Sequence, residues 1–312
     1  MKRLPFFFSM RECPHRCIYC NQNTITGESG AIAPDDVRLS VNSVDGPREI
    51  CFFGGSFTCF DPDLMTAFLD AAVSAGNGGR IRISTHPLCI SDKVLDLLES
   101  YPVCALELGV TSLDDEVLAT CNRGYTARQV LESLRLLMDR GFLPGAQLMT
   151  GLPGQSRESC INDLYRLAEI KGASDMMIRL YPCLVLEKTA LAALWNSGQW
   201  EPPCINETAR TAGEMIFLAR RLGFTILRTG LHETPSLAEG VLAGPHHPAM
   251  GELAMIEALA AELSHVKPGG PWMLPKRHVS LVTGHGGRGL ETLSRRLGVS
   301  PQSVSTMLHR WP

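Results

Sequence analysis

The amino terminus has no apolar run long enough for a signal sequence or a membrane span. Lys2 and Arg3 precede only the short apolar patch 6–8, where we expect a first strand. Neither an internal repeat nor a low-complexity tract is evident. The 312 residues, of which 45% are hydrophobic and 20% charged, have an ordinary globular composition, which argues against extensive disorder. They are enough for one large domain, or for one domain with an appendage.

The eleven cysteines lack the paired spacing of a secreted disulfide framework. Such usage fits a reducing compartment, so we predict a cytoplasmic protein that does not associate with membranes. No second, matched CxxC pair is present to complete an ordinary zinc site.

Three cysteines nevertheless stand close together in the run CPHRCIYC, as Cys13, Cys17 and Cys20. Three thiolates can hold three corners of a 4Fe–4S cube, whereas a cluster that only transfers electrons normally takes four. The open fourth iron can bind S-adenosylmethionine (SAM), whose cleavage by one electron yields a deoxyadenosyl radical. In this respect the chain resembles the radical-SAM superfamily. Structural zinc that includes His15, or three merely buried cysteines, are the alternatives.

Short apolar runs alternate with segments of helical periodicity, which predicts an α/β fold with a parallel sheet and crossover helices. Strands are predicted at Pro5–Ser9, Glu49–Phe53, Arg80–Thr85, Val103–Val110, Gly145–Thr150 and Met176–Leu180. Helices are predicted at Asp61–Ser74, Ser91–Ser100, Ala127–Arg140 and Arg157–Lys171. We therefore expect a partial (β/α)6 barrel with its site at the carboxyl ends of the strands, where the cysteine loop also lies.

Beyond Tyr181 the alternation loosens. Helices near Glu187–Asn196 and Asn206–Leu222 precede a short strand near Thr225–Arg228. We predict a barrel over residues 1–225 and a carboxyl-terminal extension with a basic tail over residues 226–312. A turn or linker is expected at Val266–Pro271.

The second predicted strand is followed by Gly54, Gly55 and Ser56. Paired glycines let a backbone approach a ligand closely, although a tight turn would use them equally well. Beside the cysteines they resemble the radical-SAM glycine motif, which implies contact with the amino group of SAM. Tyr19, between the last two cysteines, is expected to pack beside the cluster or the adenine.

The fourth strand and its loop resemble a signature of the group that contains the oxygen-independent coproporphyrinogen oxidases and the radical-SAM subunit of the Elongator complex. The matching residues run from Glu107 to Leu118 and from Asn122 to Tyr125. The resemblance implies that Glu107, Thr111 and Arg123 face SAM, with Arg123 on its carboxylate. Thr111 departs from the glutamine usual at its position, and its hydroxyl has a shorter reach. A surface salt bridge to one of the acidic residues at 114–116 is the alternative for Arg123.

The next two strands continue the resemblance. Gln147 precedes a GLPGQS turn and would contact ribose or adenine, unless it is a buried, satisfied amide. Arg179 lies in RLYP, similar to the RIYP pattern of the Elongator-like branch. An unpaired buried charge is costly, so we expect an anion of SAM or of the substrate to pair with Arg179.

The resemblance covers roughly Leu4 to Gly251. By likeness to the Elongator-like extension, His232, His246 and His247 are candidates to face the substrate, although lone histidines are as often structural. No acetyltransferase domain follows in this sequence, so we do not expect acetyl transfer by this chain alone.

The tail from Leu263 carries seven basic residues and one acidic residue, a net charge of +6 that leaves −9 for the rest of the chain. A nucleic-acid footprint and a solvated basic face both fit this asymmetry. Residues 290–304 read like a helix-turn-helix with Gly298 in the turn and Ser300 as a cap. A metal- or cluster-containing DNA-binding regulator is therefore one alternative function.

The sequence as a whole favours a radical-SAM enzyme that abstracts hydrogen with a deoxyadenosyl radical. A 4Fe–4S cluster, SAM and an electron donor are the implied cofactors and partners. A tRNA nucleoside, bound with help from the basic tail, is the predicted substrate, and a porphyrin-like or other small molecule is the rival.

Overall fold

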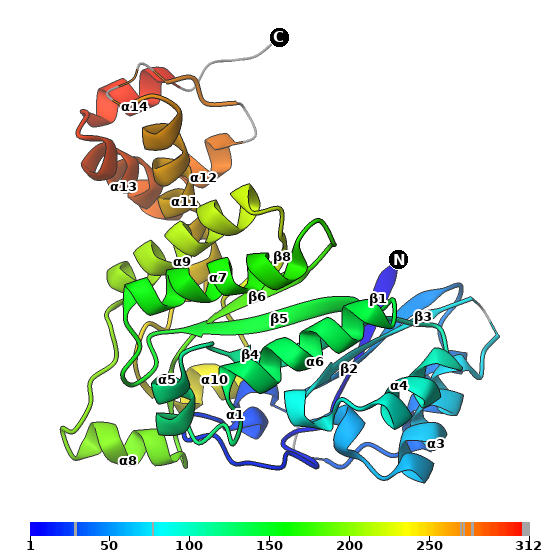
Figure 1. Cartoon of the computed structure of the whole chain (residues 1–312). Helices are drawn as coiled ribbons and strands as arrows, with labels where there is room; N and C mark the ends of the chain where they lie inside the picture. Colours follow the sequence, from blue (N-terminus) through cyan, green and yellow to red (C-terminus); the bar gives the residue numbers. More distant parts are fainter. Residues whose placement is uncertain (28–29, 77, 269, 271, 276–277, 308–312) are drawn as a thin grey trace.

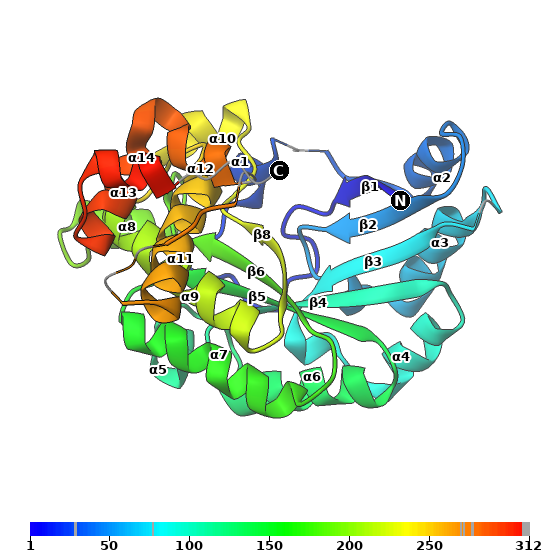
Figure 2. The ribbon, with the colours of Figure 1, turned by 90° about the horizontal axis from the view of Figure 1, so that it is seen from above.

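The computed structural model describes residues 1–27, 30–76, 78–268, 270, 272–275 and 278–307. Its main sheet has seven parallel strands in the order β1-β2-β3-β4-β5-β6-β8. These strands are β1 (Lys2–Phe7), β2 (Arg48–Phe53), β3 (Arg80–Thr85), β4 (Val103–Thr111), β5 (Leu143–Thr150), β6 (Met177–Pro182) and β8 (Thr225–Thr229). The sheet curls into a half-barrel whose convex side is covered by helices (Figures 1 and 2).

The α/β fold with a partial barrel of parallel strands is confirmed, with one addition to the predicted count. All six predicted strands form, although the first begins three residues earlier than predicted. The segment 225–229 becomes a seventh strand because it pairs in parallel with β6. The boundary predicted after residue 225 thus falls at the first residue of β8, and the division into domains stays a prediction.

The convex side carries α2 (Pro34–Asn42), α3 (Pro62–Val73), α4 (Asp92–Glu99), α6 (Ala127–Asp139), α7 (Arg157–Lys171) and α9 (Ile205–Arg221). Their starts follow from local chemistry. Asp61 caps α3 through the backbone N–H of Asp63, and Thr126 and Gln129 form a reciprocal capping box on α6. Aromatic rings fill the layer between β2 and α3, where Phe52 stacks on Phe57 at 4.6 Å between ring centroids.

Two of the cysteines are paired, which differs from our expectation. Cys59 and Cys89 form a disulfide that joins the 3₁₀ turns Phe57–Cys59 and Pro87–Cys89. These turns follow β2 and β3, so the parallel pairing of the two strands brings together cysteines that are 30 residues apart. The other nine cysteines are free. No helix in the described part of the chain is long and apolar enough to cross a membrane.

A smaller layer lies at the carboxyl ends of the strands. It contains a two-stranded antiparallel sheet of β7 (Val185–Leu186) and β9 (Val241–Ala243) with α10 (Pro235–Gly240) and α1 (Gln22–Thr26). Buried Leu184, Leu186 and Leu237 hold these pieces together, and partly buried Ile25 and Leu231 pack against them. The helices α5 (Asp115–Thr120) and α8 (Ala190–Asn196) lie at the same end of the barrel (Figure 1).

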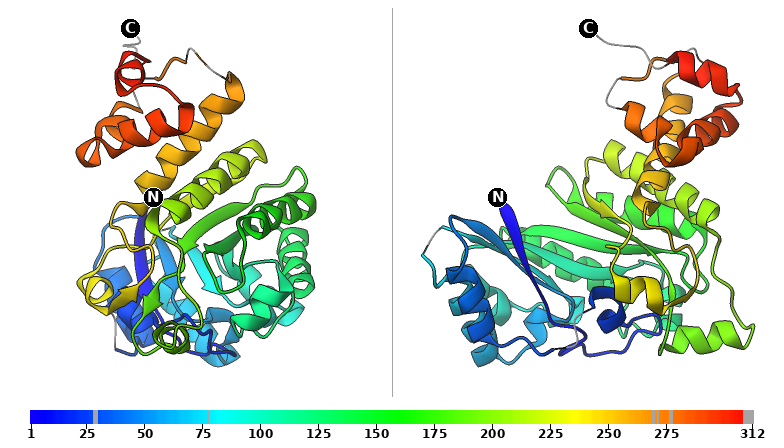
Figure 3. Two further views of the ribbon diagram at one scale, coloured as in Figure 1. Left: turned by 90° about the vertical axis from the view of Figure 1, so that its left-hand side faces the viewer. Right: turned by 180° about the vertical axis from the view of Figure 1, so that it is seen from behind.

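Four helices at the carboxyl-terminal end of the described chain extend the molecule at one side, and the first of them begins against the barrel (Figure 3). They are α11 (Met250–Val266), α12 (Val279–Thr283), α13 (Arg288–Leu297) and α14 (Pro301–Met307), and they share a small apolar core with buried Trp272. The helix α11 packs so closely on α9 that a Cβ at Gly213 would lie 2.4 Å from the Cβ of Glu257. The turn predicted at Gly298, between α13 and α14, is confirmed. Gly298 has φ 67°, and Ser300 Oγ accepts from the N–H of Ser303.

The described arginines of the basic tail turn back toward the protein. Arg296 pairs with Glu257 at 3.0 Å and with Glu214 at 3.5 Å, and Arg295 also reaches Glu257. Arg288 bonds to His247 at 3.1 Å. Lys276, Arg277 and Arg310 lie outside the described residues. Two of the seven basic charges in the tail are therefore compensated by carboxylates within the chain.

Candidate active site

A cavity of about 620 Å³ opens at the carboxyl ends of the strands, where the fold class predicts a site. Eleven of the twelve predicted site residues line it: Cys13, Cys17, Tyr19, Cys20, Gly54, Gly55, Ser56, Thr111, Arg123, Gln147 and Arg179. The twelfth, Glu107, is 1% exposed and lies beneath this lining. The fold therefore gathers predicted residues from five different strands, or from the segments that follow them, in one cavity.

The three cysteines lie in the loop between β1 and α1 and face this cavity. The Sγ of Cys13 lies 3.3 Å from the Oγ of Ser56, and Arg123 Nη1 donates to the Sγ of Cys17 at 2.7 Å. Burial, together with the neighbouring thiols, raises the pKa of Cys20 to about 12, and burial also raises that of Cys13. Their thiolates therefore need a positive charge close by, such as an iron–sulfur cluster provides.

Cluster ligation and single-ion ligation make different demands on these thiols. Within the described residues, no three His, Cys, Asp or Glu side chains are grouped so that they could hold one metal ion. A four-iron cube does not require such a group, because each cysteine binds a different corner. His15, the further zinc ligand considered, lies over Gly124 and stacks on His86 at 6.0 Å between ring centroids.

The glycine pair has a structural reason to be present. A Cβ at Gly55 would lie 2.4 Å from the carbonyl oxygen of Phe8 and 2.5 Å from that of Arg11. Gly54 has φ 95°, which a side chain would strain, and its carbonyl accepts from the amide of Gln22. The pair thus lets the cysteine loop lie directly against the turn after β2, so that both reach one cavity. The sequence interpretation did not include this packing.

Arg123 is buried rather than on the surface, so the alternative of a surface salt bridge is wrong. Its Nε donates to the hydroxyl of Tyr125 at 2.6 Å, and its Nη2 donates to the carbonyl of Gly109. Asp114 instead caps α5 through the N–H of Glu116. No carboxylate in the described chain pairs with the buried guanidinium, whose charge remains available to the thiolates and to an anionic ligand.

Thr111 sits at an unusual backbone position. The pairing of β4 with β5 shifts register between Leu108 and Thr111, and Thr111 has φ 68°, which is strained for a β-branched residue. Its Oγ1 lies 3.0 Å from the hydroxyl of Tyr19. Burial raises the pKa of Tyr19 well above its usual value, so this phenol stays neutral. The two hydroxyls therefore present one polar edge of the cavity.

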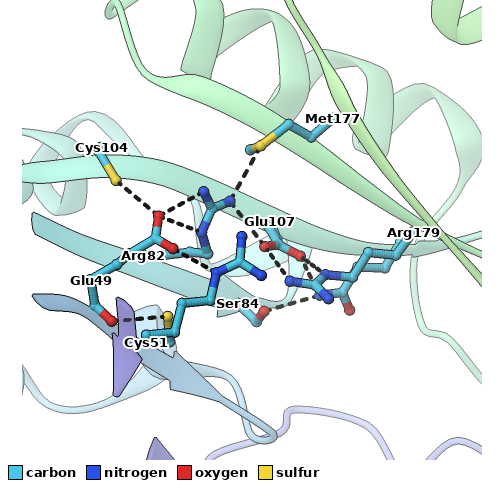
Figure 4. Close-up of polar contacts among 10 residues, drawn as sticks. Glu49, Cys51, Arg82, Ser84, Cys104, Glu107, Met177 and Arg179 are labelled. Atoms are coloured by element: carbon cyan, nitrogen blue, oxygen red, sulfur yellow. Dashed lines mark hydrogen bonds and ion pairs between the residues drawn. The ribbon is translucent and has the colours of Figure 1, made fainter. Parts of the chain in front are cut away.

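Beneath the cavity lies a charged row, shown in Figure 4. Glu107 accepts from Arg179, with one contact at 3.0 Å, and from Arg82 at 3.2 Å. Burial favours the neutral carboxyl, but the hydrogen bonds and charge of Arg179 outweigh it and lower the pKa of Glu107. A Cβ at Gly145 would lie 2.8 Å from the Cγ of Glu107, so this glycine makes room for the carboxylate. The expectation that a ligand anion pairs with Arg179 is thus wrong, because the protein supplies Glu107.

Gln147 lines the cavity just above this row. Its Nε2 donates to Ser84 Oγ at 3.0 Å and to Glu107 at 3.2 Å. Its carbonyl oxygen has no hydrogen bond within the described residues, so a ligand hydroxyl or amino group could donate to it. The amide nitrogen is therefore satisfied within the protein, whereas the contact of Gln147 with ribose or adenine stays a prediction.

The three candidate histidines lie in different places. His232 lines the mouth of the cavity and is exposed. His246 instead bonds to Glu233 at 3.1 Å, and His247 accepts from the N–H of Ala249 and contacts Arg288. Only His232 faces the cavity, so the structure does not bring the three together.

Sequence reasoning missed several lining or supporting residues, namely Phe53, His86, Tyr125, Tyr181 and Arg228. Tyr125 could have been found, because it closes the same loop motif that contains Arg123. His86 follows β3, where its Nε2 lies 3.3 Å from the carbonyl of Arg123. Burial and the charge of Arg123 lower the pKa of His86 to about 3, so it is a neutral packing partner.

A half-barrel with three thiols, a buried arginine and a glycine turn at its strand ends defines an enzyme built to hold an iron–sulfur cluster and a small cofactor. Residues 8–167 match the model of the radical SAM superfamily, and residues 176–262 match the radical SAM C-terminal domain. The chain therefore belongs to the radical SAM superfamily, and it is an enzyme of the kind that uses a 4Fe–4S cluster and SAM.

Curated relatives agree with this assignment. The chain is 26% identical to the tRNA uridine(34) acetyltransferase of Methanocaldococcus jannaschii over 66% of its length, but spans only 41% of that protein. It is 28% identical to protein YhcC of Escherichia coli over 65% of its length and 70% of that protein. Human Elongator complex protein 3 matches 39% of the chain at 35% identity, and that match spans 22% of the human protein.

Solved structures show the same fold. The archaeal Elp3 of Methanocaldococcus infernus superposes with a TM-score of 0.64 at 22% identity, covering 81% of this chain and 64% of that one. Coproporphyrinogen III oxidase of Escherichia coli gives a TM-score of 0.50 at 20% identity, covering 71% and 52%.

Proposed function

We propose that Cys13, Cys17 and Cys20 hold the 4Fe–4S cluster by three corners and that SAM occupies the free corner. When bound and reduced by one electron from a donor, these groups would supply cleavage of SAM and abstraction of a hydrogen atom from the substrate. The observation that carries this proposal is the convergence of the three thiols, Arg123 and the Gly54–Gly55 turn on one cavity.

The chain's own residues would orient and neutralise these groups. The guanidinium of Arg123 offsets the charge of Cys17 and can reach the carboxylate of SAM, while backbone groups of Gly54 and Gly55, which line the cavity, can meet its amino group. Thr111 and Tyr19 offer hydroxyls, and Gln147 offers a carbonyl oxygen to the adenosine. Glu107 acts from below by fixing Gln147 and Arg179.

Anaerobic reconstitution with iron and sulfide, then reduction with dithionite in the presence of SAM, tests this function. Chromatography should detect 5′-deoxyadenosine from the reconstituted protein. Alanine at Cys13, Cys17 or Cys20 should abolish both the bound cluster and the product. The exposed free Cys204 gives a matched control, since Cys204→Ser should leave both unchanged. Undiminished product from a variant in which all three cysteines are replaced by alanine would refute the proposal.

For the substrate we propose a tRNA nucleoside. The relative from Methanocaldococcus jannaschii carries tRNA uridine(34) in its name, and human Elongator complex protein 3 also matches 39% of the chain. The tail adds less support than its sequence indicated, because the described arginines at 288, 295 and 296 engage groups within the protein. The same pairing weakens the alternative of a DNA-binding regulator that acts through the final helices.

Addition of unfractionated tRNA to the reduced enzyme distinguishes the two substrate classes. A tRNA substrate should stimulate 5′-deoxyadenosine formation and leave a changed nucleoside in enzymatic digests analysed by mass spectrometry. Stimulation by a porphyrinogen, with tRNA inert, would favour the small-molecule rival instead.

A further inference from the structure

Arg228, on the last strand of the half-barrel, lines the same cavity as the cofactor motifs. It is the registered neighbour of Arg179 on β6, so two guanidinium groups lie side by side on the inner face. Its Nε donates to the carbonyl of Gly230 at 2.9 Å, and its Nη2 donates to that of Leu231 at 3.1 Å. These bonds fix the group in place and leave Nη1 without a hydrogen bond among the described residues.

The carboxylates of the barrel interior are already committed to other arginines. Glu107 pairs with Arg179 and Arg82, and Glu49 pairs with Arg82 and Arg3. In the described chain, Arg228 has no carboxylate within ion-pair distance. A partly buried guanidinium that keeps only neutral acceptors is suited to bind an anion that arrives with a ligand.

An aromatic surface lies on the other side of Arg179. Phe7 and Phe53 line the cavity with their ring centroids 6.2 Å apart, and the guanidinium of Arg179 lies 5.4 Å from the ring of Phe53. Both rings are only partly buried. Aromatic faces and guanidinium planes are the groups on which proteins stack unpaired bases of RNA. Arg179 thus connects a stacking surface with a free cation.

We propose that Arg228 binds a phosphate of a nucleotide substrate whose base stacks at Phe7 and Phe53. This inference rests on the proposed function, because it assigns the substrate side of the same cavity. Exposed His232, four residues beyond Arg228 at the cavity mouth, would flank the incoming strand. The carbonyl contacts of Arg228 aim its planar group, so a phosphate meets a preset donor.

Salt dependence of tRNA binding tests the assignment. Fluorescently labelled, unfractionated tRNA is titrated with the cluster-loaded protein over a range of salt concentrations, and the logarithm of the affinity is plotted against that of the salt. Because each phosphate contact contributes close to one unit of slope, Arg228→Gln should make the slope shallower by about 1 and weaken binding about tenfold at low salt.

Two further variants separate charge from folding. Arg228→Lys keeps the charge and should keep the slope. Arg140→Gln removes an arginine that is held by Asp96 and Glu99 on the convex side, and it should change neither slope nor affinity. Iron and sulfide content per chain shows that each variant holds its cluster. An unchanged slope in Arg228→Gln, or the absence of salt-dependent tRNA binding by the parent protein, would overturn the inference.

The two proposals fail in different assays. Formation of 5′-deoxyadenosine by the parent protein without tRNA reports only on the cluster and SAM. If that product is missing while the slope still falls in Arg228→Gln, the phosphate assignment stands and the proposed function fails. If the product forms and the slope does not change, only the role of Arg228 is lost.

Discussion

The guanidinium of Arg123 lies 2.7 Å from the sulfur of Cys17, although 106 residues separate the two in the chain. The contact joins the turn between α5 and α6 to the loop after β1 and places a permanent positive charge beside the thiols. The same guanidinium is held by Tyr125 and by the carbonyl of Gly109. Its position is therefore set by the protein before any ligand binds.

Replacement of Arg123 by glutamine should lower 5′-deoxyadenosine formation by about 10- to 100-fold. A hydrogen bond to a charged group contributes about 1.5–3 kcal/mol, which corresponds to that range. Arg123→Lys should recover only part of the loss, because an ammonium cannot reproduce the planar set of contacts. Product yield and SAM affinity are measured in parallel. A glutamine variant with unimpaired SAM binding would contradict the predicted carboxylate contact.

Loss of Glu107 should destabilise the barrel. Glu107→Gln leaves buried Arg179 short of its anion, and breaking such a pair costs about 3–5 kcal/mol. Anaerobic urea unfolding of the cluster-free protein measures this free energy. The matched control is Glu99→Gln, at an exposed partner of Arg140, which should leave the unfolding midpoint in place. Equal midpoints for the two variants would show that the charged row contributes little.

A methyl group at Gly55 should displace the cysteine loop. Gly55→Ala puts a Cβ within 2.5 Å of two carbonyl oxygens, so the loop or the turn must move. We expect at least a tenfold loss of reconstituted cluster, read from iron content and absorbance. Gly30→Ala is the control, since no atom lies within 4 Å of its new Cβ. Normal iron content in Gly55→Ala would argue against this packing role.

Asp163 should make stability depend on pH. Burial raises its pKa from 3.8 to about 7, against the hydrogen bonds from the N–H of Leu113 and the hydroxyl of Ser112. The folded state therefore holds a proton that the unfolded chain loses near pH 4. The contribution of this group to the free energy of unfolding is fully present below that pH. It is lost as the pH rises through about 7, by on the order of a few kcal/mol.

Asp163→Asn should flatten this dependence, because its amide oxygen can accept from Leu113 and its nitrogen can donate to Ser112. Thermal unfolding of the cluster-free protein between pH 5 and pH 8 provides the comparison, with approximate limits set by the shifted pKa. A slope as steep in the variant as in the parent would assign the pH effect to other groups.

Sequence patterns predicted this fold and much of this candidate site because the signals for both lie in short, continuous stretches of the chain. The apolar run of β3 coincides with its predicted bounds, and Cys13, Cys17 and Cys20 lie within eight residues of one another. The partner of Arg179 was not predictable in the same way. Glu107 lies 72 residues away and is chosen by the register of neighbouring strands.

The residues that were not predicted are likewise brought to the site, or to each other, by strand pairing in the folded protein. Arg228 looked like the end of an isolated short strand, because nothing local shows that 225–229 completes the sheet. Its neighbour Arg179 is determined by parallel pairing across a helical crossover. The disulfide between Cys59 and Cys89 likewise joins two turns that only the sheet brings together.

The boundary between the two family matches falls between β5 and β6, so the barrel is built from two consecutive segments of the chain. The cysteine loop and the motifs after β2, β4 and β5 come from residues before 176, where the second family match begins, whereas β6 and β8 come from within that match. Exchange of the later segment would replace Arg179, Arg228 and the mouth of the cavity while leaving the three cysteines and Arg123 untouched. The part of the cavity wall that carries Arg179 and Arg228 can therefore change as one continuous segment, separately from the part that carries the three cysteines and Arg123.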